Sequence, residues 1–500
     1  MEKAEKKKKK GKKKTRKKFY VTTPIYYPTD SPHLGNAYTT LAADILARWY
    51  KLLGYDVFFL TGTDEHGQKL AEAAKAAGME PKKFVDSMVE KFKEAWKKLN
   101  VEYDGFIRTT DKKHEEAVKR FIKKIYENGD LYKDYYEGFY CIPCESYWTK
   151  KDLIDEKCPS CGREVRLFRE EAYFFRLSKY QKKLLEIYEK NPRFVLPESR
   201  KNEIVARIKE GLKDVSFTRK AFKWGVEFPI DPDYALWVWP DALINYISGL
   251  DWPKSKFKKF WPADVHLIGK DILWFHAVIW PAMLFSAGID LPKTIFAHGW
   301  WTVNGEKMSK SKGNIVEPIK LIEKYGVDSF RYFIFREVPF GHDGDFREEA
   351  MKTRHNNELA NKLGNLVSRV AALIEIVGIE KRKPKETENE LFNKLKLDEI
   401  KESMENYNFD HALALIFDFI DECNSYVQQK KLWESKDKKA LYDVADCIRI
   451  IAILLWPFMP TTSEKIAKQF NFEIKSIDDC RPGLLKVTKI KKGEILFKKV

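Results

Sequence analysis

The strongest constraint on the fold of this chain is a strand–loop–helix–strand pattern that occurs near the N-terminus and again in the second half. In the first copy, a short buried strand over 19–23 leads through a polar loop to a helix over 37–53 and a strand over 57–60. Apolar residues recur at helical spacing in the helix, and Gly54 is placed as its stop. This order predicts a βαβ unit, in which the two strands run parallel because the helix carries the chain back across the sheet.

The second copy has a strand over 265–268, an apolar helix over 271–288 and a strand over 294–297. Between the two copies lies a segment over about 115–225 that contains a cluster of cysteines. The simplest architecture is a doubly wound, Rossmann-type α/β domain split by this insertion. Its ligand is expected at the carboxyl ends of the strands, where the two halves meet.

From about residue 350 the pattern changes to periodic helical segments, which predicts a helix bundle. Apolar residues at alternating spacings of four and three form one stripe, made of Leu359, Leu363, Leu366, Val370 and Leu373. The predicted segments are a Lys-rich disordered tail at 1–18, the two halves of the α/β domain at 19–114 and 226–335, the insertion at 115–225, and a linker with the helical bundle at 336–500.

The charge of the chain favours a polyanionic partner, because each neutralised phosphate releases condensed counterions. The formal net charge of the 500 residues is +17, and residues 1–18 alone hold twelve Lys and Arg against two Glu. Three interpretations of this basic tail remain open: a solvated arm, an arm that anchors RNA, or a nuclear-type address. No apolar stretch reaches the roughly 18 residues that span a bilayer, and no apolar block follows the basic start. We therefore expect no membrane association and a cytoplasmic protein.

Four of the seven cysteines form a pair of CxxC motifs, which is a strong zinc signal. Two such turns can supply four thiolates to a tetrahedral Zn²⁺ with no open position, so one structural zinc per chain is predicted rather than a catalytic one. Redox pairing is the alternative, but an odd total with a tight quartet favours an intracellular metal site. The proposed ligands are Cys141, Cys144, Cys158 and Cys161.

Two loops are placed to bind a nucleotide. In the first, His33 and Asn36 flank Gly35 just before a helix, whose N-terminus offers unpaired N–H groups to phosphates. In the second, the segment KMSKSKGN puts Lys307 and Lys310 on a short loop after the last strand of the second unit. Cations on a mobile loop over a triphosphate stabilise pyrophosphate as it leaves. Alone, the first motif often arises by chance and the second is a basic surface turn, but in a doubly wound sheet the two loops face each other.

These two motifs carry a family resemblance. The HLGN at 33–36 resembles the HIGH signature of class I aminoacyl-tRNA synthetases, and 307–311 is identical to their KMSKS loop. The segments FYVTTPIYYPTDSPHLGN, FFLTGTDEHGQK, WPDALINYISGL and HLIGKDILWFHAVIWPAML resemble methionyl-tRNA synthetases in particular. The likeness extends from about Phe19 to about Trp433, and more loosely to the C-terminus. One departure is Asn36 in place of the second signature His, since an amide donates to a phosphate oxygen but carries no charge.

The resemblance implies the roles of individual residues. His33, Asn36, Lys307 and Lys310 would stabilise charge in the transition state without covalent catalysis. The ATP site, with Mg²⁺ bound to the nucleotide, would consist of His33, Gly35, Asn36, Gly269, Asp271, Lys307, Met308, Ser309, Lys310 and Ser311. The methionine site, with Asp64 facing the ammonium group, would consist of Ile25, Tyr27, Asp64, Val238, Trp239, Ala242, Leu243, Tyr246, Ile272, His276 and Trp280. Without the resemblance, the apolar members of this set would be assigned to a plain core.

In the bundle, Asn361, Asn365 and Arg369 stand four residues apart and share one helix face, where amides and a guanidinium can read unstacked bases. The resemblance implies that these residues and Trp433 bind the anticodon. The expected partners are ATP, L-methionine and tRNA(Met), including initiator tRNA, and a monomer is expected because no dimerisation domain is evident. Two alternatives stay open: another class I synthetase, for cysteine or an aliphatic amino acid, and a catalytically inactive RNA-binding relative.

Overall fold

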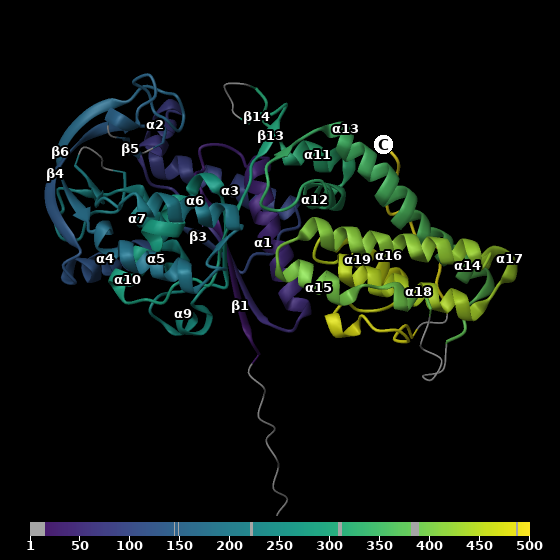
Figure 1. Ribbon diagram of the computed structural model, residues 1–500. Helices are drawn as coiled ribbons and strands as arrows, with labels where there is room; N and C mark the ends of the chain where they lie inside the picture. Colours follow the sequence, from purple (N-terminus) through teal and green to yellow (C-terminus); the bar gives the residue numbers. More distant parts are fainter. Residues whose placement is uncertain are drawn as a thin grey trace, which may run out of the picture.

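The computed structural model describes residues 16–144, 146–148, 150–220, 224–308, 313–381, 390–486 and 489–500 (Figure 1). Its centre is a six-stranded sheet in the order β3-β2-β1-β11-β12-β7, in which every neighbouring pair is parallel. The strands are β1 (Lys18–Tyr26), β2 (Asp56–Thr63), β3 (Gly105–Arg108), β7 (Val195–Leu196), β11 (Val265–Gly269) and β12 (Ile295–His298). The predicted doubly wound α/β fold is therefore confirmed, and β1 and β11 are the adjacent strands of its two halves.

Both faces of the sheet are buried, as its continuous apolar strands require. Along β1, Phe19 and Val21 belong to one hydrophobic core, whereas Tyr20 points into the other. The first core contains α1 (Leu34–Leu52), which packs against β1, β2 and β11. The second contains the helices α4 (Lys112–Glu127), α8 (Asn245–Ser248) and α10 (Trp280–Ala287). The two helices that follow β2 are α2 (Gln68–Ala76) and α3 (Pro81–Lys98).

The segment between the two halves contains a four-stranded antiparallel sheet in the order β5-β4-β6-β8, at the far left of Figure 1. Its strands are β4 (Leu131–Cys141), β5 (Ser146–Trp148), β6 (Arg166–Phe175) and β8 (Val215–Ser216). The segment also contains α5 (Gln181–Lys190) and α6 (Glu198–Lys209). It returns to the parallel sheet through β7, which pairs with β12. A second small sheet pairs β9 (Thr218–Arg219) with β10 (Ala235–Leu236).

The second half begins with α7 (Val238–Leu243), α8 and α9 (Ser255–Phe260). The helix expected over 271–288 consists of three pieces: a 3₁₀ turn over Lys270–Ile272, a π-helix over Phe275–Ile279 and α10. Pro281 is the second residue of α10 and has no N–H to donate to the preceding turn, which accounts for the break in regular α-helical bonding.

The chain then reaches the helical domain, at the right of Figure 1. A three-stranded sheet of β13 (Trp301–Val303), β14 (Glu306–Lys307) and β15 (Gly344–Asp345) lies beside α11 (Pro318–Tyr325) and α12 (Val327–Arg336). The remaining helices are α13 (Glu348–Arg354), a π-helix over His355–Gly364, α14 (Asn365–Val377), α15 (Leu397–Glu405), α16 (Phe409–Gln429), α17 (Leu432–Ser435), α18 (Lys438–Leu455) and α19 (Pro460–Gln469). The predicted bundle is confirmed. Its apolar stripe differs at one position, because Leu373 is only half-buried and the next residue, Ile374, is buried instead.

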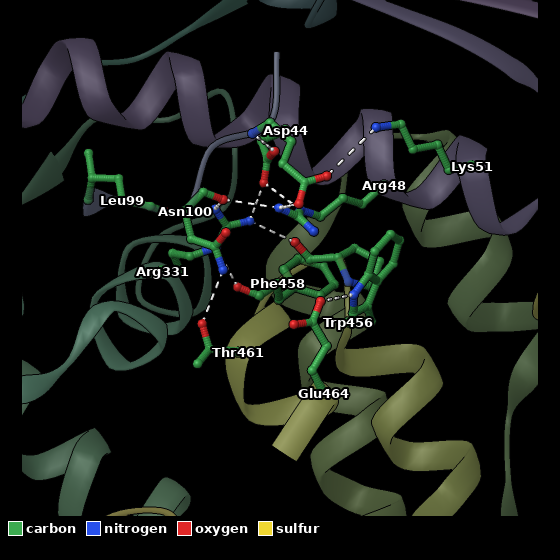
Figure 2. A network of polar contacts seen from close by, with 12 residues as sticks. Asp44, Arg48, Lys51, Leu99, Asn100, Arg331, Trp456, Phe458, Thr461 and Glu464 are labelled. Carbon is green, nitrogen blue, oxygen red and sulfur yellow. Dashed lines mark hydrogen bonds and ion pairs between the residues drawn. The ribbon is translucent and has the colours of Figure 1, made fainter. Parts of the chain in front are cut away.

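A buried polar network joins the two domains (Figure 2). Asp44 on α1 accepts from Arg48 at 2.9 Å and from Arg331 on α12 at 2.6 Å. The Arg331 guanidinium also donates to the carbonyl oxygens of Phe458, in the helical domain, and of Asn100, in the loop after α3. Although burial opposes ionisation of Asp44, Arg331 and Arg48 lower the pKa of its carboxyl group below the ordinary value. The guanidinium thus fastens the helix that follows β1 to the bundle.

Among the described residues, we find no helix that is both long and apolar enough to cross a membrane.

Candidate active site and metal centre

The loop after β1 ends in a reciprocal cap on α1. The Nδ1 atom of His33 accepts from the Gly35 N–H at 3.0 Å, and the Asn36 Oδ1 atom accepts from the His33 N–H at 3.1 Å. Although His33 is partly exposed, desolvation by the surrounding loops lowers its pKa despite the nearby carboxylates of Asp271 and Asp30. A neutral imidazole that accepts at Nδ1 carries its proton on Nε2, so His33 offers one N–H donor. The Asn36 oxygen is engaged in the cap, and its Nδ2 atom holds the donors that are left for an anion.

The loops after β11 and β12 bring Asp271 and Lys307 to the same edge of the sheet. Trp300, directly after β12, links them: its Nε1 donates to Asp271 Oδ1 at 3.2 Å, and Lys307 Nζ lies 4.1 Å from its ring centroid. At Gly269, a Cβ atom would lie 2.6 Å from Asp271 Oδ1, so any other residue here would force this carboxylate to move. The sequence interpretation missed Trp300, although its place after a parallel strand was a usable signal.

Of the four residues that follow Lys307 in the KMSKS loop, the structure describes only Met308. Met308 lines a cavity of about 1020 Å³ together with His33, so the start of this loop adjoins the HLGN motif. The predicted ATP ligands Ser309, Lys310 and Ser311 lie outside the described residues.

A cavity of about 690 Å³ opens beside these loops. Nine of the eleven predicted methionine residues line it: Ile25, Tyr27, Asp64, Trp239, Ala242, Leu243, Tyr246, Ile272 and His276. The other two, Val238 and Trp280, are buried and absent from the lining, and the Trp280 ring lies 6.0 Å from that of Tyr246 behind the wall. Phe275, which the sequence interpretation missed, also lines the cavity and stacks on Trp239 at 3.6 Å.

Two polar side chains of the cavity wall, those of Tyr246 and His276, are hydrogen-bonded to each other. The Tyr246 hydroxyl lies 2.6 Å from His276 Nε2, and His276 Nδ1 lies 3.0 Å from the carbonyl oxygen of Ile272. Burial lowers the pKa of His276 to about 4, so the ring is neutral. The carbonyl can only accept, so the proton is on Nδ1 and Tyr246 donates to Nε2. A side chain that packs against Tyr246 and His276 therefore meets polar atoms that are already paired.

Asp64 is the acidic group of this cavity. It follows β2 directly, and its backbone N–H donates to the carbonyl of Tyr26 on β1 at 2.9 Å. The residue is only 7% exposed yet lines the cavity, so its carboxylate faces a space largely screened from water. A buried carboxylate beside an apolar pocket is suited to pair with a ligand ammonium group.

The four predicted metal ligands converge. The sulfur atoms of Cys141, Cys144, Cys158 and Cys161 all lie within 4.8 Å of one another. The distances from Cys141 to Cys161 and from Cys144 to Cys158 are 3.5 and 3.8 Å. A tetrahedral Zn²⁺ with Zn–S bonds of about 2.3 Å holds its sulfurs about 3.8 Å apart, so the four thiols fit a closed zinc site. Cys144 and Cys161 also line the 690 Å³ cavity, so the metal centre adjoins the active-site region.

In the bundle, three of the four predicted anticodon residues lie together. Asn361, Asn365 and Arg369 line one surface depression, where Arg369 Nη2 donates to Asn424 Oδ1 at 3.3 Å. Trp433 does not line this depression; it is 42% exposed on α17, which lies at the same end of the bundle as α14 (Figure 1).

Comparisons with known proteins cover both domains. The family model for class I tRNA synthetases (M) matches residues 19–167 and 150–371, and that for the anticodon-binding domain of tRNA ligases matches 391–493. The methionine–tRNA ligase of Caldanaerobacter subterraneus subsp. tengcongensis is 49% identical over 96% of this chain and 79% of its own length. That of Thermotoga maritima is 47% identical over 97% of this chain and 80% of its own length.

Solved structures agree with these relatives. Mycobacterium tuberculosis methionyl-tRNA synthetase in complex with methionyl-adenylate superposes with a TM-score of 0.91 at 39% identity, covering 96% of this chain and 99% of that one. The free-state structure of the same enzyme gives a TM-score of 0.85 at 36% identity, covering 97% and 98%. The matched relatives, the matched domains and the site geometry agree, and the chain belongs to the methionine–tRNA ligase family of class I aminoacyl-tRNA synthetases.

Proposed function

We propose that the chain activates methionine with ATP in the 690 Å³ cavity and then transfers the methionyl group to the 3′ end of tRNA(Met), including initiator tRNA. The observation that carries this assignment is that one cavity is lined both by the Asp64 carboxylate and by apolar and aromatic side chains. Lys307, which begins the KMSKS motif, also lines this cavity, and Met308 and His33 together line the neighbouring one. The adenylate bound to the Mycobacterium tuberculosis enzyme is the intermediate that such a site would form. The methionine and ATP residues predicted from the sequence are retained here as proposals.

In the first step, the methionine carboxylate attacks the α-phosphorus of ATP, and the bond to the β-phosphate oxygen breaks to release pyrophosphate. The Asp64 carboxylate holds the ammonium group and so orients the attacking carboxylate. His33, through Nε2–H, and Asn36, through Nδ2, donate to the charge that develops on the phosphoryl oxygens, and the lysines of the KMSKS loop stabilise the pyrophosphate. No covalent enzyme intermediate is needed, because positioning and charge stabilisation supply the acceleration.

In the second step, a hydroxyl of the terminal ribose of tRNA attacks the methionyl carbonyl and AMP leaves. Asn361, Asn365 and Arg369 are proposed to contact the anticodon bases at the depression on the bundle, and Trp433 to stack on one of them. The catalytic domain and the bundle lie side by side, so one tRNA is expected to contact both.

Two metal ions belong to this proposal. A structural zinc would be held by Cys141, Cys144, Cys158 and Cys161, whose closed set leaves no position for a substrate. Mg²⁺ would enter with ATP as its phosphate-bound cation. The monomeric state, the cytoplasmic location and the domain division expected from the sequence remain part of the proposal.

Selection of methionine follows from the paired hydroxyl and imidazole of Tyr246 and His276. A hydroxyl or amide side chain in this cavity would lose its bonds to water and find these partners engaged, whereas a thioether loses little and packs well on aromatic rings. This argument disfavours polar amino acids, and the exchange test below addresses the alternative of another class I synthetase, for cysteine or an aliphatic amino acid.

The test is ATP–pyrophosphate exchange with each of the twenty amino acids, on folded and zinc-loaded protein. Exchange dominated by methionine is the expected result. Exchange dominated by another amino acid would keep the reaction class and overturn the pocket assignment. Absence of exchange would favour the catalytically inactive RNA-binding relative.

A further inference from the structure

Behind the methionine cavity lies a buried carboxylate between two histidines, and none of the three side chains lines the cavity. Asp241 Oδ2 lies 2.7 Å from His66 Nδ1, and Asp241 Oδ1 lies 2.8 Å from His114 Nε2. His114 Nδ1 in turn lies 2.7 Å from the Ser248 hydroxyl. We call His66, Asp241 and His114 the His–Asp–His cluster.

The cluster connects elements that form different walls of the cavity. His66 follows Asp64 by two residues in the loop between β2 and α2, and Asp241 lies on α7 between the lining residues Trp239 and Ala242. Ser248 ends α8, the helix that carries Tyr246. The cluster therefore joins the acidic side of the cavity to its aromatic side.

The loop that carries Asp64 is held at its other residues too. Glu65 accepts from Arg108 through both carboxylate oxygens, at 2.6 and 2.9 Å. The Trp224 indole donates to the Glu65 carbonyl oxygen, and the Gly67 N–H donates to the Trp224 carbonyl oxygen. With His66 bound to Asp241, the three residues that follow Asp64 are held in place while Asp64 faces the cavity.

A buried charge cluster is an expensive way to hold a fold together, since apolar residues of similar volume stabilise equally well. Burial by itself would raise the pKa of Asp241, but His66 and His114 lower it to about 2, so the carboxylate is ionised. Burial likewise lowers the pKa of His66, but Asp241, with smaller contributions from Glu115 on α4 and from Glu65, more than offsets this. Beyond stability, such a cluster fixes the orientation of the bonded side chains and of the segments that carry them, because charge-assisted hydrogen bonds tolerate little change in geometry.

We propose that His66, Asp241 and His114 are positioning residues that set the placement of Asp64 relative to the Trp239–Tyr246 wall, and thereby the affinity for methionine. This inference rests on the proposed contact between Asp64 and the ammonium group of methionine. It assigns no chemistry to the cluster: the two histidines hold Asp241, and Asp241 holds α7 against the loop of Asp64.

The test compares two variants at one position. In His66→Asn, the amide nitrogen takes the place of Nδ1 and can still donate to Asp241, whereas His66→Leu removes the donor at similar volume. We expect His66→Leu to raise the KM for methionine about tenfold or more, the size of effect that loss of one charge-assisted bond produces, and to change the KM for ATP less than about twofold. His66→Asn should recover most of the methionine affinity. Both constants come from ATP–pyrophosphate exchange.

A purely structural role predicts a different outcome: both KM values would move together with thermal stability, and the Asn variant would give no selective rescue. That result, or an unchanged methionine KM in folded His66→Leu, would overturn the inference. Should His66→Leu fail to fold, His114→Gln, whose amide nitrogen replaces Nε2, is compared with His114→Leu under the same expectation.

Asp64→Asn separates this inference from the proposed function. A large rise in methionine KM for Asp64→Asn with none for either leucine variant would leave the ammonium contact standing and reject the positioning role alone. No change for Asp64→Asn would reject the ammonium contact itself, and the positioning role with it.

Discussion

The methionine cavity and the candidate anticodon surface differ in how exposed their recognition side chains are. In the cavity, the hydroxyl of Tyr246 and the imidazole of His276 are buried and already paired with each other. On the bundle, Arg369 makes one long bond to Asn424, and Trp433 is 42% exposed with its Nε1 bonded to the neighbouring Glu434.

This difference follows from the size of the ligands. A small amino acid offers few contacts, so the site must be preorganised to discriminate it at a low entropic cost. A tRNA offers a large interface and unstacked bases, so exposed amide, guanidinium and indole groups can pair with bases as they arrive. Changes in the cavity should therefore affect the first step, and changes on the bundle only the steps that involve tRNA.

The largest effect on stability is expected where the domain that holds the cavity contacts the bundle. In Arg331→Met, Asp44 loses one of its two guanidinium partners, and the carbonyls of Leu99 and Phe458 lose the Arg331 donor, whereas the Asn100 carbonyl keeps Arg48 (Figure 2). Breaking a buried ion pair costs about 3–5 kcal/mol, so we expect the free energy of unfolding to fall by about that amount. Urea denaturation followed by fluorescence measures it. Lys324→Met, which removes an exposed partner of Glu348, is the control and should change stability far less. An equal loss in both variants would show that the network does not join the domains.

Within the catalytic region, Lys310→Ala should lower the rate of ATP–pyrophosphate exchange about 100- to 1000-fold, the usual loss on removing one donor that acts in the transition state. The dissociation constant for tRNA should stay within about twofold, because the contrast between the regions assigns this lysine to the first step. Lys320→Ala, an exposed lysine paired with Glu317 on α11, is the matched control. Exchange at the wild-type rate in Lys310→Ala would remove this lysine from the mechanism.

On the bundle, Trp433→Ala should raise the KM for tRNA about tenfold, because stacking of one base on an aromatic ring contributes about 1–3 kcal/mol. ATP–pyrophosphate exchange without tRNA should not change. Aminoacylation at varied tRNA concentration measures the first quantity, and Tyr135→Ala, an exposed aromatic residue on β4, serves as the control. A fall in the exchange rate would mean that Trp433 on the bundle affects methionine activation in the cavity, contrary to the separation of the two regions.

Much of the site was predictable because the topology of a parallel sheet places sequence-distant loops together. The rule that ligands bind at the carboxyl ends of strands predicted that the loop of His33, after β1, would face the loop that begins at Lys307, and His33 and Met308 do line one cavity. The cysteine quartet was predictable for a related reason, since a metal centre requires its ligands to converge whatever the surrounding fold.

The features that escaped prediction depend on contacts without a local pattern. His66 and Asp241 are 175 residues apart, and each reads as an ordinary polar residue next to a motif. The strand β7 has two residues, too few for an alternation to be recognised. Phe275 stacks on Trp239, which is 36 residues earlier in the chain, so no local pattern indicates the contact.

The smallest effect is expected for the basic tail, which belongs to neither region. Residues 1–15 hold nine Lys against two Glu, a net charge of +7. Deletion should end at residue 15, because the Lys17 carbonyl accepts from the Asp56 N–H and Lys18 begins β1. If the tail contacts tRNA phosphates, its removal should weaken tRNA binding severalfold at low salt and flatten the dependence of log Kd on log[salt], while exchange stays unchanged. A variant with the nine lysines replaced by Gln keeps the length and should behave like the deletion, since the contact is one of charge. Equal tRNA affinity of all three proteins at several salt concentrations would identify the tail as a solvated arm, and would assign tRNA binding to the bundle surface and the catalytic cavity alone.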